Sequence, residues 1–319
     1  MIKIALDIMG GDNAPLSNIN GAIDFLNKNQ ESVKIYMVGD EKKILHELDK
    51  NSNISQNSFE IVHTSQVVDS NDKPSKIIRR KPDSSMNKSI CLLKDNIVDG
   101  VVSSGNTGCL VSSAFFNLGT IKGVKRPALF TIIPSKNGNF LLGDVGANPS
   151  SKPEQLLQFS KMASIYMQYE LKIKEPKIAL LNIGSEPNKG NELIKSSYNL
   201  MEKELHNFIG NIESRYIFDS KADIVICDGF TGNIVLKLIE GTMSYNLNLI
   251  ANKLNLKSTD QIDSLKSIYD YEQTGAAPIL GVNGLVLKSH GASSRISIFN
   301  ALKTAQRLSN INLISKIQP

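Results

Sequence analysis

The sequence contains no tryptophan and few residues of the types that bind metals or form disulfides. Its three cysteines, Cys91, Cys109 and Cys227, are odd in number and widely spaced, which argues against a disulfide framework and against a zinc site. None of its four histidines belongs to a His-x-x-x-His pair. We therefore expect no bound metal.

Long apolar runs are also missing. No uninterrupted apolar stretch approaches the roughly 20 residues that cross a bilayer, and the apolar stretch at the N-terminus is broken at Asp7. We therefore expect a cytoplasmic protein with neither a signal peptide nor a transmembrane helix.

Arginine is scarce, since only six of the 36 basic residues are arginine. Lysines that are spread along a chain are typical of a solvated surface, so we expect no nucleic-acid partner. The formal net charge of +5 still favours an acidic partner. Its candidate contacts are Arg79, Arg80, Lys81, Arg126 and Arg295. For Arg79 and Arg80, a plain solvated helix face is an equally good interpretation.

Short β-branched runs alternate with helical periods along the chain, which predicts an α/β fold with a mostly parallel sheet between two helix layers. The predicted strands are 2–7, 33–39, 59–63, 99–103, 128–133, 140–144, 177–183, 223–228 and 285–289. Asn137-Gly138 predicts an antiparallel hairpin between two consecutive runs. Asp40 is expected to cap one helix, and Ser151 to open a capping box with Glu154.

Two glycine-rich loops each follow a predicted strand and precede a helix. The first contributes Asp7, Gly10, Gly11, Asp12 and Asn13, and the second contributes Ser104, Gly105, Asn106, Thr107 and Gly108. Glycines let the backbone approach a ligand, and free N–H groups at a helix start attract an anion, so we expect a phosphate cradle. A tight strand-to-helix turn is the alternative for the first loop. Neither a dinucleotide fingerprint nor a P-loop motif occurs.

Three later loops carry further polar residues at predicted strand ends. They contribute Asp144 and Asn148, then Glu186 and Lys189, then Asp228, Gly232 and Asn233. Lys189 is a candidate to neutralise a phosphate or a developing oxyanion, with Glu186 orienting it. The Asn233 amide can donate to a carbonyl oxygen from the first turn of a helix, although it can equally be a plain N-cap.

The last predicted strand brings three more candidates, Asn283, Lys288 and His290. His290 is the only histidine among such residues, although most lone histidines are structural. Cys109 begins a predicted helix, where a thiol pKa can be lowered. Because no histidine stands near it to activate it, Cys109 is a poor candidate nucleophile.

Taken together, these loops closely resemble one family, the phosphate acyltransferases of bacterial phospholipid synthesis (the PlsX family). The matching stretches are ALDIMGGDNAP, RRKPDSSM, SSGNTG, RPALFTIIPS, LLGDVGAN, NIGSEPNKGNEL, DIVICDGFTGNIVLKLIEG and GAAPILGVNGLVLKSHGASS. They run in the family's order and cover nearly the whole chain.

The resemblance implies transfer of a fatty acyl group from the thioester of an acyl carrier protein to inorganic phosphate. It implies a single domain over residues 1–319, with a three-layer fold similar to that of the isocitrate and isopropylmalate dehydrogenases but without a nucleotide or other cofactor. It also implies a homodimer, and it leaves open a peripheral contact with the inner membrane. Lys189 and Asn233 carry over as catalytic residues, and the GGDN, SGNTG and NGLVLKSHG loops are expected to line the cleft.

Two features depart from the family pattern. Cys109 stands where relatives usually have a small residue such as alanine, which further argues against a thiol nucleophile. The helical tip, about residues 241–275, looks shorter and less basic than that of relatives. Residues 259–272 carry four acidic side chains against one lysine, which argues against electrostatic attraction to a membrane.

The expected reaction needs few catalytic groups, because a thioester is already activated: its leaving thiol has a pKa of about 8.5 and departs readily as the thiolate. The enzyme then needs hydrogen-bond donors that position phosphate and one donor that stabilises the oxyanion of the thioester, and it needs no serine–histidine pair. We assign phosphate to the GGDN and SGNTG amides with Lys189. The thioester oxygen is assigned to Asn233, with Lys189 as an alternative donor. His290 is assigned as the acid that protonates the departing sulfur.

Three other functions stay open at this point. A short-chain phosphotransacylase that uses coenzyme A has similar loops. An NAD-dependent decarboxylating dehydrogenase shares the expected fold, but the dinucleotide fingerprint is missing. A non-catalytic, membrane-associated scaffold is the third, and activity of the pure protein that is lost in Lys189→Ala and Asn233→Ala would exclude it.

Overall fold

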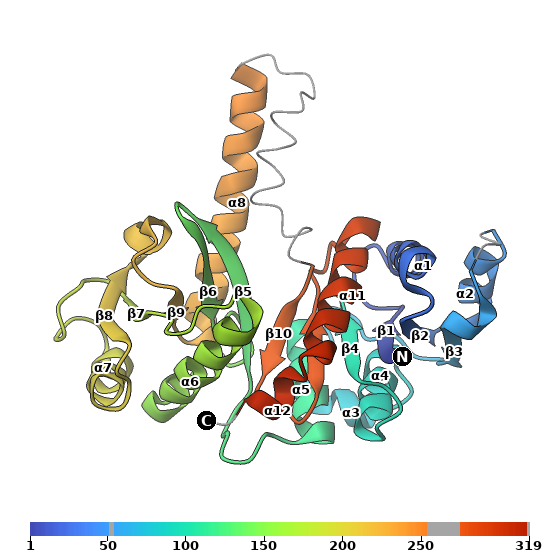
Figure 1. The fold of residues 1–319 in the computed structure, drawn as a ribbon, viewed down its shortest axis with the longest axis horizontal. Coiled ribbons are helices and arrows are strands. Elements are labelled where there is room, and N and C mark those ends of the chain that lie inside the picture. The colour runs from blue at the N-terminus through green and yellow to red at the C-terminus, as the bar shows by residue number, and fades with distance from the viewer. Residues whose placement is uncertain (51–53, 254–274, 318–319) are drawn as a thin grey trace. The chain divides into compact units, whose positions relative to one another are not determined.

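The computed structural model describes residues 1–50, 54–253 and 275–317 (Figure 1). The chain divides into two compact units. Unit 1 comprises Met1–Pro127 and Tyr271–Gln318, and unit 2 comprises Ala128–Asp270. The division reflects how densely the residues of each unit contact one another, and it does not test whether the whole chain works as one functional domain. The single domain over residues 1–319 therefore stays a prediction.

Unit 1 contains a mostly parallel sheet in the order β3-β2-β1-β4-β11-β10. The strands are β1 (Ile2–Asp7), β2 (Val33–Gly39), β3 (Phe59–His63), β4 (Gly100–Ser103), β10 (Ala277–Leu280) and β11 (Leu285–Lys288). Neighbouring strands pair in parallel except β10 and β11, which are antiparallel. Every residue of β4 and β11 is buried, as expected for strands that are covered on both faces.

Two pairs of helices pack against the unit 1 sheet, α1 with α11 and α4 with α5 (Figure 1). The helices of this unit are α1 (Leu16–Asn29), α2 (Glu41–Leu48), α3 (Ile77–Arg80), α4 (Ser85–Lys94), α5 (Thr107–Leu118), α11 (Arg295–Asn310) and α12 (Leu313–Lys316). Gly21 allows α1 to approach α11 closely, because a Cβ at this position would lie 2.6 Å from Ile298 Cβ. Apolar side chains of both helices, such as Ile19 and Leu302, are completely buried there.

The strands of unit 2 lie in the order β5-β6-β9-β7-β8. Its strands are β5 (Ala128–Ser135), β6 (Gly138–Gly143), β7 (Ile178–Asn182), β8 (Phe208–Glu213) and β9 (Ile224–Ile226), and its helices are α6 (Pro153–Glu170), α7 (Glu192–Glu204) and α8 (Gly229–Lys253). β5 and β6 form the predicted antiparallel hairpin, whereas the other pairs are parallel. Helix α6 packs on α7 and on β6 and β9, and α8 extends well beyond the sheet of its own unit (Figure 1).

The helix-start prediction is confirmed at Asp40, whose carboxylate accepts hydrogen bonds from the N–H groups of Lys42 and Lys43. The prediction for α6 is wrong by one residue. Lys152 occupies the cap, and its N–H donates to Gln155 Oε1 at 2.7 Å, so Ser151 and Glu154 do not form the box. Proline at the first helical position fixes this boundary.

Two strands, β8 and β10, were not predicted. β8 contains Gly210 and polar residues and lies at one end of the unit 2 order, so it lacks the continuous apolar run of a central strand. β10 is only four residues long and contains Pro278. No helix within the described residues is long and apolar enough to cross a membrane. The acidic segment 259–272 lies outside the described residues.

Candidate active site

Unit 1 brings three of the predicted loops together. We call residues 7–15, 103–108 and 288–293 the unit 1 loop cluster. They follow β1, β4 and β11, and β4 pairs in parallel with both of the other strands. Because the carboxyl ends of neighbouring parallel strands share one edge, the three loops meet there, where open α/β sheets bind ligands.

Asp7 lies at the centre of this cluster with 1% of its surface exposed. Its Oδ1 accepts a hydrogen bond from Ser85 Oγ, and its Oδ2 accepts one from Ser103 Oγ, both at 2.6 Å. The backbone N–H groups of Met9 and Gly10 also donate to this carboxylate. Burial raises the pKa of Asp7, and these hydrogen bonds oppose the rise. Asp7 thus holds the first two loops together from inside the protein.

The first and third loops are joined through their backbones. The Asp12 N–H donates to Gly291 O at 2.7 Å, and Asn13 Nδ2 donates to Ala292 O at 3.1 Å. Gly11 has a φ of +104°, and a Cβ there would lie 2.9 Å from Gly291 O. Only glycine satisfies both conditions, so this close approach requires Gly11.

The second loop leads into α5. Asn106 caps the helix, since its Oδ1 accepts a hydrogen bond from the Cys109 N–H at 3.0 Å. The first turn of a helix presents N–H groups that have no partner within it. Beside this turn, Ser104 is only 3% exposed, and its hydroxyl has no hydrogen-bond partner among the described residues. Such a hydroxyl, next to helix N–H groups, is suited to bind an anion.

The third loop adds a cation and an imidazole. Lys288 is 9% exposed, and its Nζ donates to Ser104 O at 3.4 Å and also to Ser289 O. His290 is half-buried, and its Nδ1 accepts a hydrogen bond from the Ala292 N–H at 3.2 Å. A positive charge therefore lies directly behind the second loop, where it favours a negative ligand.

Unit 2 brings its three predicted loops together in the same way. We call residues 143–148, 182–191 and 227–233 the unit 2 loop cluster. They follow β6, β7 and β9, and β9 pairs in parallel with both of the other strands. The carboxyl ends of these three strands therefore lie at one edge, and the three loops meet there.

Asp144 is completely buried and accepts five hydrogen bonds. Its Oδ1 accepts from the N–H groups of Leu129, Gly146 and Ala147, and its Oδ2 accepts from the Asn148 N–H and from Asn148 Nδ2. Burial raises the pKa of Asp144 against these bonds. Asp144 orders the 143–148 loop in the way that Asp7 orders the unit 1 loops.

Asn233 lies in the first turns of α8, and its side chain is exposed. Asp228 caps this helix, since its Oδ1 accepts from the N–H groups of Phe230 and Thr231. The alternative that Asn233 is a plain N-cap is therefore wrong. A Cβ at Gly146 would lie 3.7 Å from Asn233 Cγ, so the Asp144-ordered loop lies directly beside this amide.

Lys189 and Glu186 both lie over Gly184. A Cβ at Gly184 would lie 3.0 Å from Lys189 Cγ and 2.9 Å from Glu186 Oε2. The backbone of the loop is fixed, because Asn182 Nδ2 donates to Lys189 O at 3.1 Å and Asn211 Nδ2 donates to Glu186 O at 3.0 Å. Both charged side chains are exposed, so Lys189 presents its ammonium from an ordered loop.

The comparisons with known proteins agree with one another. A sequence model of a family described as "fatty acid synthesis protein" matches residues 2–316. The chain is 40% identical to a phosphate acyltransferase of Halothermothrix orenii, covering 99% of this chain and 98% of the relative. It is 43% identical to a phosphate acyltransferase of Acetivibrio thermocellus, covering 99% and 95%.

The chain belongs to the phosphate acyltransferase family. It is therefore an acyltransferase enzyme, and the resemblance drawn from its loops is confirmed. Solved structures confirm the fold class. A phosphotransacetylase from Streptococcus pyogenes is similar with a TM-score of 0.64 at 12% identity, covering 97% of this chain and 94% of that one. A branched-chain phosphotransacylase from Enterococcus faecalis has a TM-score of 0.60 at 16% identity, covering 97% and 99%.

In this phosphate acyltransferase, Asn283 lies apart from the unit 1 loop cluster. It precedes β11, at the amino end of the strand whose carboxyl end carries Lys288 and His290. Its Nδ2 donates to Leu118 O at 3.2 Å and to Thr120 O at 2.9 Å, so it fixes the turn after α5. A role of Asn283 in substrate binding stays a prediction.

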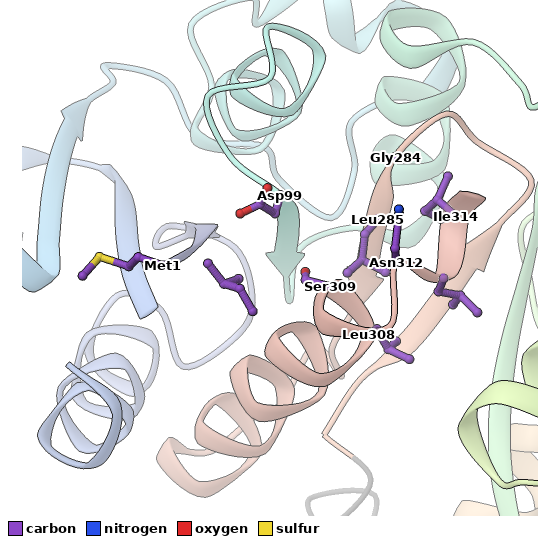
Figure 2. Close-up of a pocket in the computed structure, with 10 residues that line it drawn as sticks. Met1, Asp99, Gly284, Leu285, Leu308, Ser309, Asn312 and Ile314 are labelled. Atoms are coloured by element: carbon purple, nitrogen blue, oxygen red, sulfur yellow. The ribbon is translucent and has the colours of Figure 1, made fainter. Parts of the chain in front are cut away.

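The unit 1 sheet also borders a cavity of about 500 Å³ at the amino ends of its strands (Figure 2). Residues from the starts of β1, β4 and β11 and from the C-terminal end of α11 line it; they include Met1, Asp99, Leu285, Leu308 and Ser309. Figure 2 shows Asp99, which directly precedes β4, and Ser309, near the end of α11, among the residues that line the cavity. None of the predicted site residues lines this cavity, which lies at the strand ends opposite to the loop cluster.

Cys109 is completely buried, and burial together with the nearby Asp72 charge raises the pKa of its thiol to about 11. A thiol with that pKa is almost entirely protonated at neutral pH and is a poor nucleophile. Within the described ranges, no three His, Cys, Asp or Glu side chains gather closely enough to hold a metal ion.

Sequence reasoning missed two residues that build the site. Asn18 on α1 is 1% exposed, and its Nδ2 donates to the carbonyls of Asp7, Ile8 and Gly10 at 2.9–3.1 Å. Ser85 on α4 supplies one of the two hydroxyl groups that donate a hydrogen bond to the Asp7 carboxylate. Ser85 belongs to the RRKPDSSM stretch, which gave a signal for it, whereas nothing local marks Asn18.

Proposed function

We propose that this enzyme transfers a fatty acyl group from the thioester of an acyl carrier protein to inorganic phosphate. A phosphate oxygen attacks the thioester carbonyl carbon, a C–O bond forms, and the C–S bond breaks. The products are acyl phosphate and the carrier thiol, which takes up one proton. The family supplies the phosphate acyltransferase activity, and the carrier substrate and the direct attack are our proposal.

The observation that carries the proposal is the buried, unpartnered hydroxyl of Ser104 beside the start of α5. A polar group buried at a helix N-terminus costs free energy unless something binds it, and phosphate oxygens accept from both the hydroxyl and the helix N–H groups. Lys288, which donates to Ser104 O, adds a positive charge at this point. We therefore assign phosphate to the unit 1 loop cluster.

We assign polarisation of the thioester to Asn233 and, as the alternative to its phosphate contact, to Lys189. Both side chains are exposed, yet both project from ordered segments of the unit 2 loop cluster. An ammonium and an amide N–H are the donors that stabilise a developing oxyanion, and loss of one such donor typically lowers kcat by roughly 100-fold to 1,000-fold. His290 is the candidate to protonate the leaving sulfur.

The decisive experiment traps the product. Purified enzyme is mixed with a long-chain acyl carrier protein and phosphate, and acyl phosphate is captured with hydroxylamine as the hydroxamate. Lys189→Ala and Asn233→Ala should lose activity by roughly 100-fold while they remain folded. Lys136→Ala, which removes an exposed lysine from the β5–β6 turn, is the matched control and should retain it.

Three further measurements define the chemistry. Ser104→Ala should raise the KM for phosphate more than the KM for the carrier thioester, because the removed hydroxyl is assigned to phosphate. Acetyl-CoA should be a poor donor, and efficient use of it would favour a coenzyme A-dependent phosphotransacylase instead. Isolation of a covalently acylated enzyme after mixing with the acyl carrier protein alone would refute direct attack.

We also propose that the enzyme is a homodimer that uses α8. Phe230, Ile234 and Leu238 recur every four residues along this helix and are 52–66% exposed. A helical stripe of exposed apolar side chains marks an interaction surface. Light scattering should give about twice the chain mass of 35.0 kDa for the wild type. Tyr245, on the same helix, is 66% exposed. Leu238→Lys/Tyr245→Lys should give the monomer mass, and an unchanged dimer would refute this use of α8.

A further inference from the structure

A cluster of exposed cations adjoins the unit 1 loop cluster. Lys73 directly precedes a 3-10 turn that ends at Lys76, and Arg79 and Arg80 end α3. All four side chains are exposed. We call these four residues the basic face. None of them forms an ion pair with another residue in the described part of the chain. Like charges this close in the chain repel one another, so a fold gains nothing from grouping them there.

Two of the acidic side chains nearest in sequence, Asp69 and Asp72, are already paired with Lys81. The third, Asp83, accepts hydrogen bonds from the N–H and the hydroxyl of Ser65. Lys81 Nζ contacts the carboxylates of Asp69 and Asp72, each at 2.6 Å, and it also donates to Val67 O at 2.7 Å. Ile77, which is 2% exposed, anchors the segment in the core. The basic face is therefore held in place by Lys81 and Ile77, which leaves its own four charges directed to solvent.

This segment packs on the second loop of the unit 1 loop cluster. Asn106 Nδ2 donates to Ser70 O at 2.9 Å, and a Cβ at Gly108 would lie 2.8 Å from Pro74 Cγ. The two segments contact each other at the residues that begin α5, so a partner bound on the basic face would lie beside the loop assigned to phosphate.

We propose that the basic face is the docking surface for an acidic protein that carries the acyl thioester. The inference rests on the proposed function, because it names where the macromolecular substrate binds for that same reaction. Four unpaired cations attract a surface rich in carboxylates and raise the rate of productive encounter. The protein that carries the acyl thioester must bring it to the loop assigned to phosphate, and the basic face lies beside that loop. A nucleic acid or an anionic membrane has no such requirement, so the position favours the carrier.

The test compares matched charge reversals. Arg79→Glu/Arg80→Glu and Lys73→Glu/Lys76→Glu reverse two cations each within the basic face. Lys94→Glu/Lys303→Glu makes the same change of net charge at two exposed lysines elsewhere in unit 1, on α4 and α11. Melting curves identify any variant that fails to fold. If a glutamate variant fails to fold, the variant with glutamine at the same two positions is measured in its place.

Initial rates of hydroxamate formation are measured with an acyl carrier protein and, separately, with the neutral small thioester acyl-pantetheine. At low salt, each basic-face variant should raise the KM for the carrier by roughly 10-fold to 100-fold with little change in kcat. The wild-type KM should rise with salt and approach that of the variants. Rates with acyl-pantetheine should match the wild type, because the basic face does not touch the reacting atoms.

The outcomes separate the two proposals. If the wild type forms no acyl phosphate from the carrier, the proposed function fails and the docking surface fails with it. If the wild type is active but the basic-face variants keep the carrier KM of the control variant, only the docking surface is wrong. Binding to anionic vesicles that is lost in the same variants, with an unchanged carrier KM, would show that the face binds lipid and would overturn the proposal.

Discussion

Gly232 gives the sharpest test of how unit 2 holds its catalytic candidate, because the neighbouring residue is Asn233. An ideal Cβ at Gly232 would overlap Asp144 O, and it would lie 2.8 Å from Cys227 Sγ and 3.0 Å from the Asp144 carbonyl carbon. Two of these three neighbours are backbone atoms of the 143–148 loop, which Asp144 itself fixes. Gly232→Ala must therefore displace either the start of α8 or that loop.

The same helix offers a matched control. Gly241 also lies within α8, but nothing is within 4 Å of a Cβ at that position. Alanine is better than glycine in a helix by about 1 kcal/mol, so Gly241→Ala should raise the free energy of unfolding by up to about that amount. Gly232→Ala has the same propensity gain, but overpacking against backbone costs about 1–3 kcal/mol and occasionally more. Because the propensity gain is common to both and cancels, we expect the two variants to differ by about 1–3 kcal/mol.

The measurements are urea unfolding and hydroxamate formation. Gly241→Ala should keep the wild-type kcat. Gly232→Ala should lower kcat by roughly 100-fold, because a displacement of about 1 Å of a catalytic group has an effect of that size. Hydrogen exchange should locate the loosening at the start of α8 and at residues 143–148. If Gly232→Ala is as stable and as active as Gly241→Ala, the close contact between α8 and the loop is wrong.

Three further predictions concern unit 1. Asn18→Leu removes hydrogen bonds to three buried carbonyls, so it should lower the free energy of unfolding by about 2–4 kcal/mol and raise the KM for phosphate, as urea unfolding and initial rates would show. Burial raises the pKa of Asp7 above the ordinary 3.8, so the folded protein binds this proton more tightly than the unfolded chain. The contribution of Asp7 to stability should therefore fall as pH rises through its folded-state pKa, and Asp7→Asn should flatten that part of a stability–pH curve. Because the pKa of Cys109 is about 11, Cys109→Ala should keep wild-type activity and iodoacetamide at pH 8 should leave the enzyme active; rapid inactivation that Cys109→Ala abolishes would contradict this.

Much of the architecture followed from local chemistry. Continuous apolar runs gave most strands, and Asp40 capped its helix as predicted. The hairpin formed as expected, although its two turn residues are Lys136 and Asn137, and Gly138 begins β6 with a φ of +128°. These features depend on residues that are close in the chain, and local propensity and turn chemistry act over that range.

The sequence by itself also determined the family, because its loop motifs are long and occur in one order. It placed those motifs at strand ends, and parallel pairing then brought them together within each unit. Only the tertiary structure decided what each residue does there. Asp7 became a buried centre because Ser85 and Ser103, 78 and 96 positions away, donate to it. Asn283 fixes the turn after α5, because its Nδ2 donates to Leu118 O and Thr120 O. Contacts between residues so far apart depend on how the strands are ordered and how the helices pack, and no local pattern encodes them.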